Sequence, residues 1–218
     1  MLRTGVRTRP RPIEREEGRA GKEQGMDRDE QTVEAIGQHL RGVRHRQEGQ
    51  WEEALCAQRR ALALRPDLAE AHYEVGVVNL ELRRHAEALA AFRSAIEHDP
   101  DSAEAQYGLA CAYRHLGQYG QALAACGEAL RLRPAYALAW EETGSTYGLM
   151  KEYPNAIQAF REALALEPHN ARVHCALGHA HVMMGDLTAA AEELQVLEEL
   201  DQQVADLLRA LLSSATGG

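Results

Sequence analysis

Along most of the chain, apolar residues recur every three to four positions, in the pattern of short amphipathic helices. Residues 69–82 and 86–98 form two such stretches, and similar stretches fill the chain from about residue 35 to residue 204. Short breaks separate them, such as "EGQW", "LGQY" and "MGDL", and each contains Gly or polar residues. Because a tight helix–helix turn requires such residues, the pattern predicts a series of helix pairs.

The pattern repeats with a fixed period of 34 residues. Proline recurs at this step between the predicted pairs, at Pro66, Pro100, Pro134 and Pro168. Alanine recurs at the same step in the second helices, at Ala54, Ala88, Ala122, Ala156 and Ala190. Proline ends a helix because it lacks the N–H group and clashes with the preceding turn. The spacing therefore predicts one helix pair in every period.

Small residues mark the middle of each predicted first helix, at Gly42, Gly76, Ala110, Gly144 and Gly178. A glycine inside a helix costs about 1 kcal/mol relative to alanine. A fixed series of small residues therefore indicates a packing requirement. We expect each of them to face an alanine of the second helix, so that the two backbones approach closely.

These series, with large residues such as Trp140, Tyr147, Phe92 and Phe160 at fixed positions, resemble the tetratricopeptide repeat family. The resemblance covers five units, at residues 35–68, 69–102, 103–136, 137–170 and 171–204. It implies an all-α fold, a right-handed superhelical solenoid of five tandem helix-turn-helix repeats with a C-terminal capping helix. It also implies that the first helix of each pair lines the concave face. Since this fold serves many partners, it does not by itself name one.

The N-terminal segment departs from the repeat. Residues 1–33 contain few apolar side chains, and we expect them to be disordered, with the repeat domain covering residues 34–204. The Arg-rich start is interpreted either as an electrostatic tail or as a leader without function that precedes a true start at Met26.

The C-terminal segment, residues 205–218, is expected to form a capping helix and a tail. Four apolar residues share one face of this helix and should cover the exposed side of the last repeat. They are Val204, Leu207, Leu208 and Leu211. The final residues, "SSATGG", are expected to be a frayed tail.

Helical spacing of ~100° per residue separates the packed face of each first helix from the face toward the groove. The candidate groove residues carry carboxylates, tyrosines and small apolar side chains. They are Glu70, Tyr73, Glu74, Val77, Glu81, Glu104, Tyr107, Cys111, Arg114, Glu141, Glu142, Ser145, Cys175 and His179.

An acidic groove with tyrosines suits a peptide or protein segment that bears Lys or Arg and an apolar anchor. The alternative interpretation is a solvated polar helix face. Co-chaperone repeats, by contrast, hold a C-terminal carboxylate with Lys and Asn side chains. Here Val43 and Glu74 stand where Asn is required, so a chaperone-tail ligand is not expected.

Composition narrows the function further. The chain has 218 residues and a net charge of −9, which argues against a nucleic-acid partner because phosphate binding needs a basic surface. No apolar run is long enough to cross a membrane. The four cysteines form no CxxC pair and suggest reduced thiols, so we expect a cytoplasmic protein. The oligomeric state is left open, a monomer included.

Catalysis and cofactor binding are not expected, because no catalytic motif occurs and the repeats occupy residues 35–204. The stretch "HCALGHAHVMMG" at 174–185 contains metal-ligand residue types. Helical register splits it, with His174 and His181 on the packed face and Cys175 and His179 on the groove face. We therefore predict a noncatalytic interaction scaffold without a bound metal. The alternatives are a self-assembling structural protein and, third, a metal or redox sensor.

Overall fold

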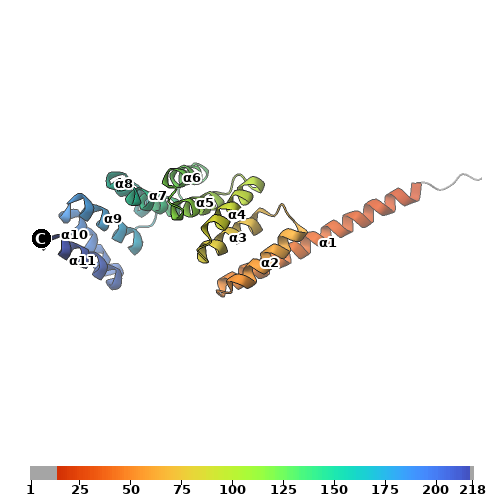
Figure 1. The fold of residues 1–218 in the computed structure, drawn as a ribbon, viewed down its shortest axis with the longest axis horizontal. Coiled ribbons are helices and arrows are strands. Elements are labelled where there is room, and N and C mark those ends of the chain that lie inside the picture. The colour runs from red at the N-terminus through yellow and green to blue at the C-terminus, as the bar shows by residue number, and fades with distance from the viewer. Residues whose placement is uncertain (1–13, 217–218) are drawn as a thin grey trace, which may run out of the picture.

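The computed structural model describes residues 14–216, and within them the chain forms eleven helices and no strand (Figure 1). The all-helical solenoid expected from the sequence is confirmed. No helix in this range is both long and apolar enough to cross a membrane. The bounds are α1 Glu14–Gln47, α2 Trp51–Leu64, α3 Ala69–Glu81, α4 His85–His98, α5 Ala103–His115, α6 Tyr119–Leu132, α7 Ala137–Leu149, α8 Tyr153–Leu166, α9 Ala171–Met184, α10 Leu187–Leu200 and α11 Gln202–Thr216.

The first ten helices pack as five pairs, and the pairs stack into an arc (Figure 1). Each odd-numbered helix from α1 to α9 contacts its even-numbered partner and also the odd-numbered helices of the neighbouring pairs. Within residues 14–216, the even-numbered helices make no contact with one another. The odd-numbered helices therefore line the inner, concave side of the arc, as the family resemblance implied.

The turns inside the pairs share one backbone conformation. A residue just after each first helix has a left-handed φ, and it recurs every 34 residues, at Gly49, Arg83, Gly117, Lys151 and Gly185. Glycine adopts this conformation without penalty, whereas a side chain makes it costly. The tight turns predicted from the polar breaks thus have a common geometric cause.

Each pair is held together by a small residue that makes room for a large one. A Cβ atom added to Gly76 would lie 2.6 Å from the ring of Phe92, and one added to Gly144 would lie 2.6 Å from the ring of Phe160. Our expectation that these glycines face alanines is therefore wrong. In the third unit Ala110 replaces the glycine, and its partner is the smaller Cys126, which is fully buried. Close approach of a large side chain, rather than of the two backbones, therefore explains the glycines at Gly76 and Gly144.

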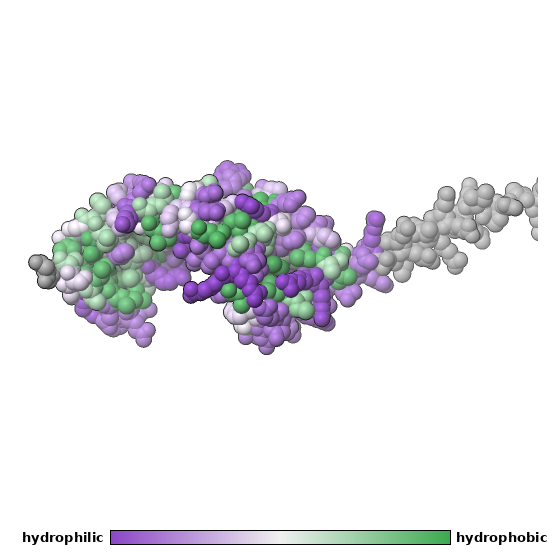
Figure 2. All heavy atoms as spheres, viewed as in Figure 1, coloured by the Kyte–Doolittle hydropathy of each residue, from purple (hydrophilic) through white to green (hydrophobic). Residues whose placement is uncertain are grey.

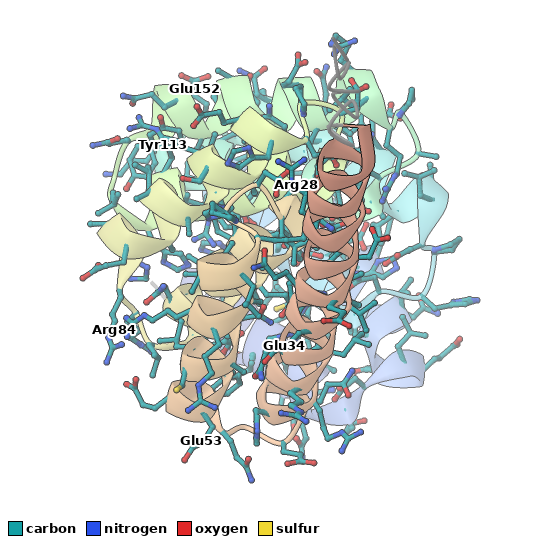
Figure 3. The ribbon with its side chains drawn as sticks, turned by 90° about the vertical axis from the view of Figure 1, so that its right-hand side faces the viewer. Arg28, Glu34, Glu53, Arg84, Tyr113 and Glu152 are labelled. Carbon is teal, nitrogen blue, oxygen red and sulfur yellow. The ribbon has the colours of Figure 1, made fainter. Side chains whose placement is uncertain are left out.

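The N-terminal boundary differs from the expected disorder, because α1 is already helical from Glu14 to residue 33. Glu, Arg, Lys and Gln make up more than half of residues 14–33, and these side chains favour helices even without burial. Figure 3 shows α1 and α2 side by side, with Arg28 and Glu34 along α1. Residues 1–13, with most of the Arg-rich start, lie outside the described residues.

At the C-terminus, α11 packs against α9 and α10, as expected for a capping helix. Leu208 is 1% exposed and occupies the space over Gly178, which the large residue of the second helix fills in earlier units. Leu207 is 67% exposed, so its expected place on the covered face is wrong. The helix also continues to Thr216, so most of the expected tail is helical and only residues 217–218 lie outside the description.

Candidate binding groove

Twelve of the fourteen candidate residues line three pockets on the inner side of the arc. Figure 2 shows this side hollowed below the middle of the stack, with strongly polar side chains at its rim. The N-terminal pocket, about 360 Å³, is lined by Glu70, Tyr73, Glu74 and Glu104. The central pocket, about 600 Å³, is lined by Glu81, Tyr107, Cys111, Arg114, Glu141, Glu142 and Ser145. The C-terminal pocket, about 290 Å³, is lined by Arg114, Ser145 and His179.

Two candidate residues line none of these pockets. Val77 is half-buried and packs against the core cluster around Phe92. Cys175 is half-buried and packs against the cluster of Leu197 and Leu208 beneath the capping helix. Both side chains serve the packing of their units, because they lie at the edge of the groove face and turn toward a neighbouring helix.

Two partly buried ion pairs join successive units on the groove side. Arg46 Nε donates to Glu74 at 2.6 Å, and Arg114 Nε donates to Glu142 at 2.5 Å. The side chains of Glu74 and Glu142 are only 10% and 7% exposed, so the arginines compensate charges that are held away from water. Arg114 lies two 34-residue periods after Arg46, and Glu142 lies two periods after Glu74.

Two further groove carboxylates also carry an arginine. Arg133 forms a hydrogen bond to Glu104, and Arg172 lies 2.9 Å from Glu141. Burial is the largest single influence on the pKa of Glu104 and raises it, but the hydrogen bond from Arg133, a backbone hydrogen bond and the charge of Arg133 together lower the pKa below its usual value. The groove is therefore less acidic than its glutamates alone suggest. The ion pairs were not predicted from the sequence. Two of them do have a sequence signal, because Arg46 precedes Glu74 by 28 residues and Arg114 precedes Glu142 by the same 28 residues.

The two groove tyrosines pack on other aromatic rings. The centroids of Tyr73 and Phe92 are 5.8 Å apart, and those of Tyr107 and Tyr136 are 5.5 Å apart. Burial raises the pKa of Tyr73 and of Tyr107, and it raises the pKa of Tyr136 to about 12. All three phenols are therefore held neutral, and Tyr73 and Tyr107 line the groove pockets.

The central pocket is also lined by three residues of basic type that are not among the candidates taken from the sequence. They are Arg83, His85 and His115, at the turn between α3 and α4 and at the end of α5. The rings of His85 and His115 stack with centroids 4.6 Å apart. Burial, followed by the charge of Arg114, lowers the pKa of His115, so its ring favours the neutral form. The central pocket thus presents both signs of charge.

The buried thiols of the described residues have raised pKa values. Burial raises the pKa of Cys111, and it raises the pKa of Cys126 to about 12, so both thiols are held protonated. His174 and His181 are buried, whereas His179 is exposed, as the register indicated. No group of three or more ligand-type side chains lies close enough to hold a metal within the part of the chain that the structure describes.

Sequence comparison identifies the repeats. Three family models, each described as Tetratricopeptide repeat, match residues 42–107, residues 80–137 and 107–147, and residues 149–214. No curated protein matches the chain.

Solved structures share the fold. TTC0263, a thermophilic TPR protein of Thermus thermophilus, is 27% identical and has a TM-score of 0.65, covering 83% of this chain and 98% of its own. MamA from Desulfovibrio magneticus RS-1 is 24% identical with a TM-score of 0.70, covering 78% and 96%. YrrB, described as a TPR protein with an unusual peptide-binding site, is 21% identical with a TM-score of 0.64, covering 81% and 92%.

Proposed function

Because the chain belongs to the tetratricopeptide repeat family, whose members generally bind protein or peptide partners, we propose that it is a noncatalytic scaffold that binds a segment of a partner in its concave groove. The proposal rests mainly on three pockets along the inner face, which are lined by twelve of the candidate residues. The structural neighbour YrrB, whose description names a peptide-binding site, is consistent with this use of the fold. Such a scaffold acts by bringing its partner into a complex.

The partner segment is proposed to carry at least one Lys or Arg. Glu70 and Glu81 form no ion pair with a basic side chain of the described residues, and neither does Asp99 in the N-terminal pocket. Glu70 and Asp99 lie in that pocket beside the ring of Tyr73. A cation there would meet unpaired carboxylates and an aromatic face. The expected preference for basic partners thus rests on these residues, rather than on Glu74 or Glu142.

The free cysteines also support a reducing compartment such as the cytoplasm. Cys56 is exposed and the other three thiols are buried or half-buried, and none of the four has a disulfide partner among the described residues.

The proposal is tested with peptides selected from a random library on the whole protein. Glu70→Gln combined with Glu81→Gln removes two unpaired charges and keeps their size. We expect affinity at low salt to fall by about 1 kcal/mol, roughly fivefold, and the salt dependence of binding to weaken. The control is Glu162→Gln, an exposed carboxylate on α8 at the outer side of the arc. Equal affinity and salt dependence in all three proteins would refute the groove as a cation-binding surface.

A second candidate function is assembly of the chain with itself. It is favoured by one observation: α1 exposes apolar side chains at helical spacing, with Val33 71%, Ile36 42% and Leu40 60% exposed. Sedimentation velocity over a range of concentrations separates the two candidates. A species that stays monomeric at the highest concentration excludes self-assembly, while a concentration-dependent increase in mass supports it.

A further inference from the structure

The junctions between successive units are filled in an alternating way on the groove side. At the first and third junctions the space holds the ion pairs Arg46–Glu74 and Arg114–Glu142. At the second junction the equivalent positions are Leu80 and Gly108. Leu80 packs against the core cluster that contains Phe92, and the Phe92 ring lies over Gly108.

At the fourth junction the equivalent positions are Gly148 and Ala176, and both of these residues are small. Phe160 stands where Phe92 stands two units earlier, with the 34-residue step taken twice. All three residues line the C-terminal pocket, together with Tyr153 and Ala180. The C-terminal pocket therefore occupies the position at the fourth junction that corresponds to Leu80 at the second junction.

The space at Gly148 is open. A Cβ atom built on this residue meets no described atom within 4 Å, in contrast to Gly76 and Gly144, where it would strike a phenylalanine ring. The pocket of about 290 Å³ is at the lower limit of cavities that hold a whole small molecule, about 300 Å³. Its size fits a single side chain instead.

We propose that the C-terminal pocket binds one aliphatic or aromatic side chain of the partner segment, in the place that Leu80 takes at the second junction. The proposal rests on the function proposed above and names its apolar anchor site. An apolar occupant follows from the equivalent position at the second junction, because there a leucine of the chain packs against the core cluster that contains Phe92. Ser145, His179 and Arg114 line the pocket as well and offer polar groups to the backbone of the bound segment.

The direct test uses N-acetyl-leucinamide as a probe and amide NMR spectra of the full chain as the measurement. N-acetyl-glutaminamide, similar in size but polar, is the matched control ligand. We expect concentration-dependent shifts for the leucine derivative that cluster at Gly148, Ala176 and Ala180, and no comparable shifts for the glutamine derivative. Shifts spread over the surface, or centred elsewhere, would overturn the proposal, whatever the behaviour of any variant.

A filling substitution gives the second arm. Gly148→Leu restores the side chain of the second junction and should weaken binding of N-acetyl-leucinamide about tenfold or more, as expected for loss of one apolar site. Gly127→Leu is the matched control, because Gly127 is also a helical glycine with open space around its Cβ position but lies on α6, outside the pocket. Unchanged binding in Gly148→Leu overturns the proposal.

Peptides selected on the whole protein separate this inference from the proposed function. If they bind the groove equally well in Gly148→Leu and Gly127→Leu, the groove function stands and the anchor site is wrong. If the leucine derivative binds at Gly148 and the filling substitution abolishes it, the anchor site stands even where no peptide is retained by the groove.

Discussion

At the level of single residues, the small residue in the middle of a first helix lies against a side chain of the second helix, and the sizes of the two are linked. Gly144 lies against Phe160, while Ala110 lies against Cys126, so an added methyl group on one helix coincides with a smaller partner on the other. Dense packing leaves no room for both to grow. The small residue of the first helix therefore limits the size of the side chain that packs against it from the second helix.

This pairing predicts that Gly144→Ala destabilises the protein, although alanine favours helices by about 1 kcal/mol. The new Cβ would lie 2.6 Å from the Phe160 ring, so we expect a net loss of about 1–3 kcal/mol in the free energy of unfolding. Urea unfolding measures the loss. Adding Phe160→Cys, which reproduces the pair in the third unit, should cost less than the sum of the two single changes.

The control for this experiment is Gly127→Ala, whose Cβ meets nothing within 4 Å among the described residues. There the helix preference acts alone, and stability should rise by about 0.5–1 kcal/mol. Equal effects at Gly127 and Gly144 would contradict the packing explanation.

At the level of helices, adjacent first helices are joined by arginines that reach from one unit to the next. Arg114 on α5 is 23% exposed and Glu142 on α7 is 7% exposed, so this pair is largely removed from water. A lone buried carboxylate is costly, whereas an apolar replacement of both partners is often tolerated.

Arg114→Leu should therefore lower the free energy of unfolding by about 3 kcal/mol, because it leaves Glu142 buried without a partner. Arg114→Leu with Glu142→Ala should recover most of this loss, since no charge then stays buried. Denaturant unfolding of both variants decides the point. If the double variant is less stable than the single one, the pair itself, rather than charge compensation, holds the junction.

The stacked histidines at the end of α5 and the start of α4 predict a pH dependence. Because burial and Arg114 lower the pKa of His115 below its ordinary 6.5, folding favours the neutral ring. This contribution is fully present above about pH 6.5 and is lost as the pH falls toward the lowered pKa. His85 and Arg83 also disfavour its charge, while Glu142 favours it.

His115→Gln should therefore lose less stability than the unsubstituted protein between about pH 7 and pH 5. Urea unfolding at several pH values measures the difference. Identical pH profiles would show that the ring does not titrate differently in the folded state.

The helices and the face of most groove residues could be predicted from the sequence, because period and helical angle fix them. Cross-unit contacts could not. The partner of Glu74 is Arg46, 28 residues earlier, and only the length of an arginine side chain brings the two together.

At the level of the whole molecule, the arc presents three different surfaces in order. The N-terminal pocket contains carboxylates without an ion-pair partner beside Tyr73, and the central pocket contains both acidic and basic side chains. The C-terminal pocket is lined by apolar and small residues, among them Gly148, Ala176 and the buried Phe160. This order gives the groove a direction. A partner segment is expected to place its cation near α3 and its apolar anchor near α9.

The most direct test of the central claim is a map of where a selected peptide contacts the full chain, measured by amide NMR shifts or hydrogen exchange. We expect the affected residues to lie on the inner faces of α3, α5, α7 and α9 and to line the three pockets. Contacts confined to α4, α6 and α8 on the outer side of the arc would contradict it.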